Sequence, residues 1–308
     1  GILSSAFGLL WFGFADELWQ FIAARTLLGA GVGMIIPPSR RFIIISSGKE
    51  QGARLGAFYG FYLCGFVFGP PISGALTILF DVRAPFFVLG IATAFSALAI
   101  RGLVIPSSDA SDAKKKRLLI KLIYKKEMIA ALLVVASFRY SIGVFEPLWA
   151  PHLNNLGAGT MLITLSLTGF ALPMLIISKW AGALSDRFGP RITSLLSAFA
   201  TLPLMASYGY IGSIPLLMIA AVPHGIFEAA QSPGSQAAVS DAAGPDDAAA
   251  AQGLGEAVGS VFSLVGALSA APIYVHLGAG LAWLSSALIM LALLTASWLI
   301  HPPVVHRD

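Results

Sequence analysis

Four polar side chains follow one another at helical spacing within an otherwise apolar stretch of the chain. They are His224, Glu228, Gln231 and Ser235, at steps of four, three and four residues. Such steps place all four on one face of a helix. Histidine titrates near neutral pH, and a carboxylate influenced by both burial and a nearby cation can load and release a proton. The stripe therefore indicates proton chemistry, with a permanently paired Glu228 and a simply hydrogen-bonded His224 as the alternatives.

Two further charges lie in another apolar stretch. Arg139 and Glu146 are seven residues apart and so share a helical face. Arg139 and Glu228 both fall near the middle of their stretches, and we predict an ion pair between them. Glu146 directly precedes Pro147, and its alternative role is to cap a helix end or to face water.

Arg25 and Glu256 are charged residues of two more apolar stretches. Charges are costly inside a bilayer and normally face a partner or a cavity. Arg25, like Arg139, would either tune the proton chemistry of Glu228 or bind an anionic substrate. Glu256 lies about two turns into its stretch with Gln252 on the same face, and is either interfacial or part of the proton and substrate pathway.

These side chains must be held by apolar elements, which the composition supplies. Hydrophobic residues make up 57% of the 308 residues and charged residues only 11%. The apolar runs are about 20 residues long, enough to cross a bilayer, and lack the alternation of a membrane β-strand. We therefore predict an all-α membrane protein. Its ten helical segments are expected at 1–14, 18–38, 53–79, 85–105, 127–149, 160–180, 191–210, 213–240, 249–275 and 279–301.

Basic residues cluster in alternate loops between these segments. They gather at 40–54, 101–126 and 179–191, and Arg307 lies in the C-terminal tail. Positive-inside bias makes that side cytoplasmic. The polar and basic segment 106–126 is therefore predicted to be a cytoplasmic linker, either lying on the anionic membrane surface or solvated. The net charge of +4 is then a topology signal, and we expect no nucleic-acid partner.

The residue patterns of soluble enzymes are missing from the sequence. Cys64 is its one cysteine, which excludes an internal disulfide and a cysteine-based metal site. The Gly29-x-Gly31-x-Gly33 pattern lies inside an apolar stretch and lacks the strand that precedes a phosphate-binding loop. Neither a HExxH zinc motif nor a GxSxG nucleophile turn is present. We expect no enzyme activity, no cofactor and no bound metal.

One motif lies in the basic region between two predicted helices. It reads Gly182-Ala-Leu-Ser-Asp186-Arg187-Phe-Gly189-Pro-Arg191. It resembles the G-x-L-a-D-R-x-G-R-R signature of the major facilitator superfamily, with Pro190 in place of one basic residue. The resemblance implies a loop that governs switching between transporter states. Its glycines would allow a tight turn, and Asp186 would lie near a helix N-terminus.

Two other motifs fall where that family would place them. The first comprises Gly56, Gly65, Gly69, Pro70, Ser73 and Gly74. It resembles the fifth-helix signature of the proton-coupled antiporters, with serine at 73 where the pattern has glycine, and implies close helix packing and a gate bent at Pro70. The second, Arg25-x-x-Leu28-Gly29-x-Gly31, resembles the fourth-helix motif with leucine in place of glutamine.

By the family's scheme the ten segments correspond to helices three to twelve, so we expect an N-terminally truncated two-bundle transporter. Its parts would be a truncated bundle at 1–105, the linker at 106–126, a six-helix bundle at 127–302 and a cytoplasmic tail at 303–308. The family lines its cavity with helices one, four, seven and ten. Arg25, Arg139, Glu146, His224 and Glu228 all fall on three of these.

The resemblance implies secondary active transport by alternating access, most simply proton-coupled efflux of a small molecule with Glu228 carrying the proton. The alternatives are an importer or facilitator of a sugar or carboxylate, and an inactive truncated remnant. The expected partners are a small-molecule substrate, protons and the lipid bilayer, and the expected state is a monomer. The expected location is the bacterial cytoplasmic membrane.

Overall fold

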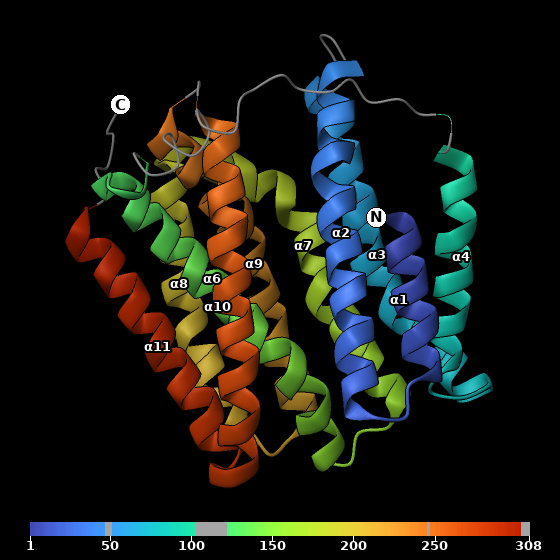
Figure 1. Ribbon diagram of the computed structural model, residues 1–308. Helices are drawn as coiled ribbons and strands as arrows, with labels where there is room; N and C mark the ends of the chain where they lie inside the picture. The colour runs from blue at the N-terminus through green and yellow to red at the C-terminus, as the bar shows by residue number, and fades with distance from the viewer. Residues whose placement is uncertain (47–50, 101, 103–121, 245–246, 303–308) are drawn as a thin grey trace. The chain divides into compact units, whose positions relative to one another are not determined.

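The computed structural model describes residues 1–46, 51–100, 102, 122–244 and 247–302, and every regular element within these ranges is helical (Figure 1). The chain divides into two compact units, 1–109 and 110–308. Most of the predicted linker, from 103 to 121, and the tail from 303 lie outside the described residues. Within the described residues, the four helices of the first unit and the six α-helices of the second correspond one to one with the ten predicted segments.

The first unit contains α1 (Ile2–Phe14), α2 (Leu18–Ser46), α3 (Gln51–Leu79) and α4 (Ala84–Ile100). Glycine allows α1 to lie close against its neighbour, since a Cβ on Gly8 would come within 2.8 Å of the Leu28 backbone in α2. The connections before α2 and before α4 are joined by an ion pair between Asp16 and Arg83. Asp81 also accepts hydrogen bonds from the backbone N–H groups of Arg83 and Ala84. The first of these bonds closes the turn. The second adds to the bond that the Ala84 N–H makes with the Asp81 backbone oxygen, so this donor at the start of α4 is paired.

The second unit contains α6 (Lys126–Asn155), α7 (Thr160–Phe188), α8 (Pro190–Ser207), the 3₁₀ turn η2 (Tyr208–Tyr210), α9 (Ile214–Ala243), α10 (Ala248–Leu277) and α11 (Ala279–Ile300). Among the eight helices long enough to span a membrane, α6 is the most buried, with 78% of its spanning residues buried. It packs against α9, α10 and α11. Figure 1 shows α6 and α10 running side by side. This enclosure brings side chains of α6 into contact with most of the unit.

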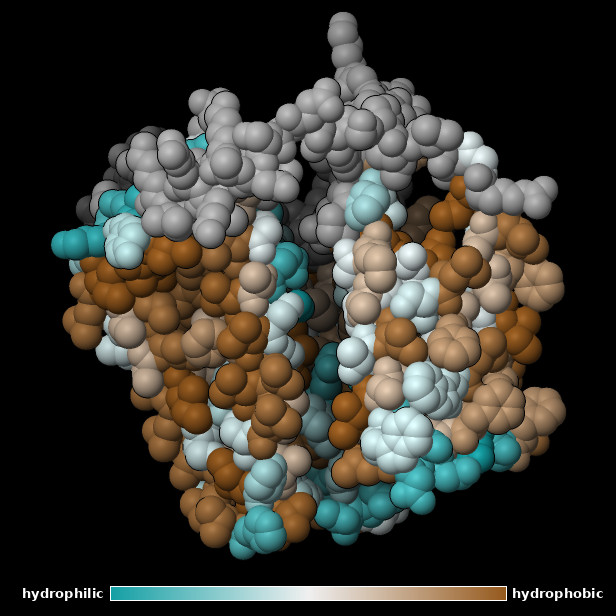
Figure 2. All heavy atoms as spheres, in the orientation of Figure 1, coloured by the Kyte–Doolittle hydropathy of each residue, from teal (hydrophilic) through white to brown (hydrophobic). Residues whose placement is uncertain are grey.

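The surface of the helices is apolar, as lipid requires. Within the described ranges eight helices are long and apolar enough to cross a bilayer, and α1 and α4 are shorter apolar helices. Leu299 of α11 and Leu268 of α10, for example, are 74% and 66% exposed. Figure 2 shows hydrophobic side chains covering most of the face in view, with hydrophilic ones gathered toward the lower helix ends. The predicted multi-pass membrane protein is confirmed.

Three helices run further than predicted. Helix α6 continues through Pro147 and Pro151 to Asn155, so Glu146 does not end a helix. Helix α7 continues to Phe188, and α2 to Ser46. Within a bilayer each unpaired backbone group is expensive, and helices therefore persist through prolines that would end them in water.

Two of the six tryptophans lie in the core of the second unit. Trp149 and Trp283 are fully buried and do not anchor the chain at the membrane interface. Trp149 donates a hydrogen bond from Nε1 to Ser166 Oγ at 2.9 Å. The extension of α6 to Asn155 accounts for the burial of Trp149, because this residue lies within the helix and not at its end.

The contact between α6 and α10 depends on glycine. A Cβ on Gly143 would lie 2.1 Å from the backbone oxygen of Ser263, and one on Gly266 would lie 2.7 Å from the Tyr140 oxygen. Both obstacles are backbone atoms, which cannot rotate away. Small residues at such positions let membrane helices approach closely and pack well.

We predict that Gly143→Ala destabilises the second unit by about 1–3 kcal/mol, because the added methyl group must push α6 and α10 apart. The matched control is Gly253→Ala, since Gly253 of α10 is exposed and an added Cβ would meet no atom within 4 Å. The control should be neutral or slightly stabilising, because alanine favours helix formation. Thermal melting of the purified protein in detergent measures both, and equal melting temperatures for the two variants would contradict the packing argument.

Candidate functional site

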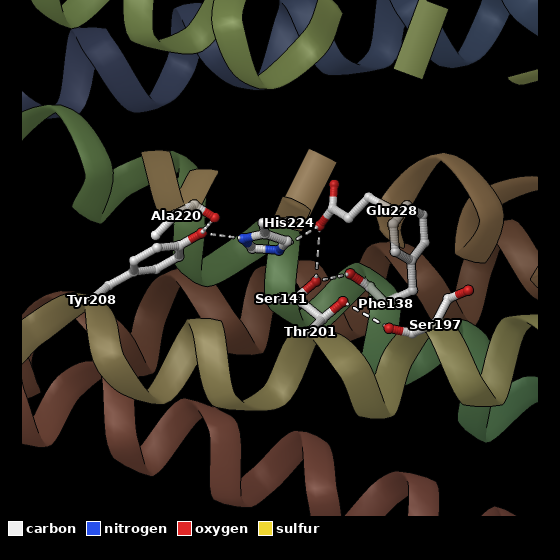
Figure 3. Close-up of polar contacts among 8 residues, drawn as sticks. All are labelled: Phe138, Ser141, Ser197, Thr201, Tyr208, Ala220, His224 and Glu228. Carbon is white, nitrogen blue, oxygen red and sulfur yellow. Dashed lines mark hydrogen bonds and ion pairs between the residues drawn. The ribbon is translucent and has the colours of Figure 1, made fainter. Parts of the chain in front are cut away.

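The core of the second unit holds a line of polar side chains from α6, α8–η2 and α9 (Figure 3). The Tyr208 hydroxyl lies 2.7 Å from His224 Nδ1. On the other side of the ring, His224 Nε2 lies 3.4 Å from Glu228 Oε1. Ser141 Oγ of α6 lies 3.5 Å from the same carboxylate oxygen. A tyrosine, a histidine and a carboxylate thus form one continuous chain of titratable groups.

The two contacts of His224 differ in kind. The 2.7 Å contact to Tyr208 is a short hydrogen bond. The contact to Glu228 is within ion-pair range, but Nε2 lacks the alignment of a hydrogen bond to any described residue. The interaction with Glu228 is therefore mainly electrostatic, and its strength depends on the protonation of both side chains.

The side chains of this line are buried and have almost no contact with solvent. His224 is 0% exposed and Glu228 is 3% exposed. The rings of Phe145 and Phe170 stand edge-on to the imidazole of His224, with ring centroids 5.6 and 5.1 Å from its centroid. The Tyr208 ring stacks on the imidazole with a centroid separation of 5.6 Å. A carboxylate in such surroundings must share charge with a neighbour or hold a proton.

The local sequence accounts for the position of the line. Gly225 allows α9 to approach α7, because a Cβ there would meet the Phe170 backbone oxygen at 2.3 Å. The helical spacing then turns His224, Glu228, Gln231 and Ser235 inward, and all four are buried. Neither amide atom of Gln231 has a hydrogen-bond partner among the described residues. The inward-facing stripe is what the spacing predicts.

The predicted ion pair between Arg139 and Glu228 is wrong. Arg139 Nη2 lies 3.4 Å from Glu256 Oε2 of α10, and both side chains are partly exposed. Gln236 Nε2 lies 3.5 Å from the other oxygen of Glu256. The aliphatic part of the Arg139 side chain lies against Gly259, where an added Cβ would come within 2.8 Å of Arg139 Cγ. Glycine on α10 thus makes room for Arg139 on the side of α6 that faces α10.

A third polar group, missed in the sequence, lies next to Tyr208. His152 Nε2 contacts the Tyr208 backbone oxygen at 3.0 Å, and Nδ1 contacts the Tyr274 hydroxyl at 3.1 Å. A carbonyl oxygen only accepts, so Nε2 of His152 carries the proton. Asn155 also donates to the Tyr274 hydroxyl. The signal available in the sequence was that a tyrosine within an apolar span needs a partner for its hydroxyl.

The remaining predicted pathway residues, Arg25 and Glu146, do not join this line. Arg25 is an exposed residue of α2 in the first unit. Glu146 is an exposed residue of α6, one position beyond the buried Phe145. Both therefore remain predictions as pathway residues.

The motif from Gly182 to Arg191, here called the switch motif, is mostly helical and not the predicted loop. Helix α7 includes its first seven residues, and the break is confined to Gly189, whose φ of +90° favours glycine. Pro190 then starts α8 at a position where its missing N–H costs nothing. The Arg187 guanidinium lies over the neighbouring Phe188 ring at 5.2 Å. The side chains at 182 and 186 lie outside those that the structure describes.

Arg191 has a specific structural role at the same place. Its Nη2 donates to the backbone oxygens of Ser297, at 2.8 Å, and of His301. These carbonyls belong to the C-terminal end of α11, where the helix dipole favours a cation. Arg191 therefore ties the start of α8 to the end of α11.

The fifth-helix motif falls on α3. Pro70 lies inside this helix and Gly74 is buried. A Cβ on Gly65 or Gly69 would meet no atom within 4 Å. Close packing at these two glycines stays a prediction.

Comparisons with known proteins agree on one family. The chain matches the sequence profile of the Major Facilitator Superfamily over residues 1–162 and 128–308. It is 25% identical over 238 residues to the multidrug resistance protein MdtG of Proteus mirabilis, covering 70% of this chain and 58% of that protein. It is 26% identical over 216 residues to the MFS-type transporter SLC18B1 of Mus musculus, covering 68% and 47%. The chain thus spans about half the length of the curated relatives it matches.

Solved structures share the fold. A bacterial homolog of the human lysosomal transporter Spinster, in an inward-facing and occupied conformation, has a TM-score of 0.78 at 13% identity, covering 97% of this chain and 80% of that one. The major facilitator transporter FucP, in the outward conformation, has a TM-score of 0.61 at 16% identity, covering 97% and 82%. The predicted all-α, major-facilitator-type fold is confirmed.

We predict that Arg139 couples energetically to Glu256 and not to Glu228. In a double-mutant cycle, Arg139→Gln and Glu256→Gln should show a coupling of about 0.2–1 kcal/mol, the range for partly exposed pairs. The cycle of Arg139→Gln with Glu228→Gln should show none. Unfolding in detergent measures both cycles, and a coupling found only in the second would restore the ion pair expected from the sequence.

Proposed function

Because the chain belongs to the Major Facilitator Superfamily, we propose that it is a secondary active transporter that exports a small molecule in exchange for protons. The resemblance seen in the sequence motifs is thereby confirmed, and family membership agrees with the expectation that the chain is not an enzyme. The proposal extends this membership to a direction, a coupling ion and a set of residues.

The observation that carries the proposal is the buried pair of His224 and Glu228. The two side chains lie on the buried face of a membrane-spanning helix, with His224 Nε2 3.4 Å from Glu228 Oε1. Ionisable groups at such depth are expensive and are kept mainly for proton or substrate pathways. Glu228 would bind the proton, and His224 would share it or supply the counter-charge.

The relatives support export. Several similar bacterial proteins are named as multidrug resistance proteins, and export of toxic compounds is one way in which a membrane transporter confers such resistance. At identities near 25% over about half of those proteins, the proposal is the export of a small molecule and names no particular compound. The bacterial relatives and the basic loops together support a cytoplasmic membrane location with the linker and C-terminus inside.

The ion pair between Arg139 and Glu256 bears on the importer alternative. A guanidinium that recognises a substrate carboxylate needs free donors directed at the substrate. Arg139 instead has a carboxylate partner within its own unit. This pairing favours a structural or switching role for Arg139 over recognition of an anionic metabolite.

In the proposed mechanism the pair of His224 and Glu228 gains and loses a proton as the transporter opens in turn to each side of the membrane. Protonation from the outer side would favour one conformation, and release to the cytoplasm would favour the other. Substrate would bind when the proton is absent, which couples the two fluxes in opposite directions.

We predict that Glu228→Gln abolishes proton-coupled export. In everted membrane vesicles carrying the full protein, an acid-inside gradient should drive uptake of ethidium, used here as a cationic probe. The same gradient should fail to drive uptake with Glu228→Gln at equal protein abundance, because glutamine cannot carry a proton. Asp16→Asn, which alters an exposed carboxylate outside the helices, should retain uptake.

Two results would count against the proposal. Gradient-driven uptake in Glu228→Gln equal to the unaltered protein would remove Glu228 as the proton carrier. Uptake that persists after a protonophore has collapsed the gradient would favour a facilitator over an antiporter.

A further inference from the structure

The Tyr208 hydroxyl stands between two possible hydrogen-bond partners on α9. It lies 2.7 Å from His224 Nδ1 and 3.4 Å from the backbone oxygen of Ala220, one turn earlier on the helix (Figure 3). A tyrosine hydroxyl can donate one hydrogen bond and accept others. Tyr208 can therefore donate to either partner, but a bond that it accepts can come only from His224.

This choice is linked to the proton count of the neighbouring pair. When His224 is neutral with its proton on Nε2, that N–H faces Glu228 and the Tyr208 hydroxyl donates to Nδ1. When the pair holds one more proton, Nδ1 carries a hydrogen. This holds when the extra proton makes an imidazolium. It also holds when the proton resides on the carboxyl and the carboxyl donates to the Nε2 of a neutral ring. Nδ1 then donates to Tyr208, whose own hydrogen turns to the Ala220 carbonyl.

We propose that Tyr208 is a positioning residue whose hydroxyl reverses its direction between His224 Nδ1 and the Ala220 carbonyl as the pair of His224 and Glu228 gains or loses a proton. The inference rests on the proposed function, in which this pair carries the coupling proton. No covalent bond of Tyr208 breaks, and the added proton stays on the pair. Tyr208 thus allows the pair to change its charge without leaving an unpaired group at Nδ1.

Among the described residues, no other group is placed to take this role. Within the described residues, α6 presents Phe145 and Ser141 to the pair, α7 presents Phe170, and η2 presents Tyr208. The titratable groups that face His224 are therefore Tyr208 and Glu228. His224 is 0% exposed, so solvent cannot replace a lost hydrogen bond at Nδ1.

The neighbouring histidine provides an internal comparison. His152 Nε2 bonds to a backbone carbonyl, a partner that can only accept. Its hydrogen at Nε2 is therefore fixed in every protonation state. His224 has a hydroxyl where His152 has the carbonyl, and only a hydroxyl permits both directions.

The first test is on the unaltered protein. Solid-state NMR of the ¹⁵N-histidine-labelled protein in lipid, with the His224 signals assigned by their loss in His224→Gln, reports which ring nitrogen carries hydrogen. We expect Nδ1 without hydrogen at high pH and with hydrogen at low pH. A His224 that keeps its hydrogen on Nδ1 throughout, or never acquires one there, would overturn the proposal without any need for a Tyr208 variant.

The second test is Tyr208→Phe, which keeps the ring and removes the hydroxyl. The protonated Nδ1 would lose its acceptor, a greater loss than that of the neutral nitrogen, because unpaired charged groups cost more. The midpoint of the His224 NMR titration should therefore move to lower pH by about one unit or more. The control, Tyr274→Phe, should change the His152 signals and leave the His224 midpoint in place.

The two readouts separate this inference from the function on which it rests. An unmoved His224 midpoint in Tyr208→Phe, with transport still abolished by Glu228→Gln, would overturn the role of Tyr208 and leave the transporter proposal standing. A shifted midpoint with transport indifferent to the proton gradient would overturn the coupling and support the local role of Tyr208. A matching shift in the pH profile of ethidium uptake would support both.

Discussion

The fold of this protein depends on one constraint: a polar group at bilayer depth is costly unless it finds a partner within the protein. The constraint explains why α6 and α7 run on through Pro147 and Pro173, since an exposed backbone break in lipid would leave donors and acceptors unpaired. It also explains why the buried Trp149 and His152 each have a hydrogen-bond partner in the core. The same requirement governs the side chains proposed to move protons, because changing a protonation state changes which atoms need partners.

Helix α6 meets this requirement by presenting different chemistry to each neighbour. Arg139 and Ser141 are two positions apart, which places them about 200° apart around the helix. Arg139 therefore faces α10 and its Glu256, whereas Ser141 faces α9 and its Glu228. Gly143, Gly259 and Gly266 bring α6 and α10 close enough for the first contact to form. The two carboxylates are thus kept in separate polar groups by the geometry of a single helix.

The helices and the inward stripe of α9 were predictable, because length, hydropathy and a repeat of three to four residues determine both. The pairing of charges was not. Periodicity tells which residues of Arg139's helix share a face, but not which neighbouring helix that face meets, and the close approach at Gly143 decides this. Tyr208 escaped notice because it lies in the short turn η2, where no helical period marks it. The continuation of α7 through the switch motif escaped notice because its glycine and basic residues are typical of a turn.

Separating Arg139 from Glu228 has a consequence for coupling. Within the described part of the chain the structure gives Glu228 no arginine or lysine partner, so its charge is balanced by His224 alone. With one added proton the pair is neutral overall, which makes its burial less costly than that of a net charge. Without that proton the pair carries a net negative charge in a site that is almost fully buried. Such a charge is stable only where water or a cationic group reaches it. In the proposed mechanism, losing the proton would therefore favour a conformation open to water or to a positively charged substrate, and this preference would link proton release to substrate binding.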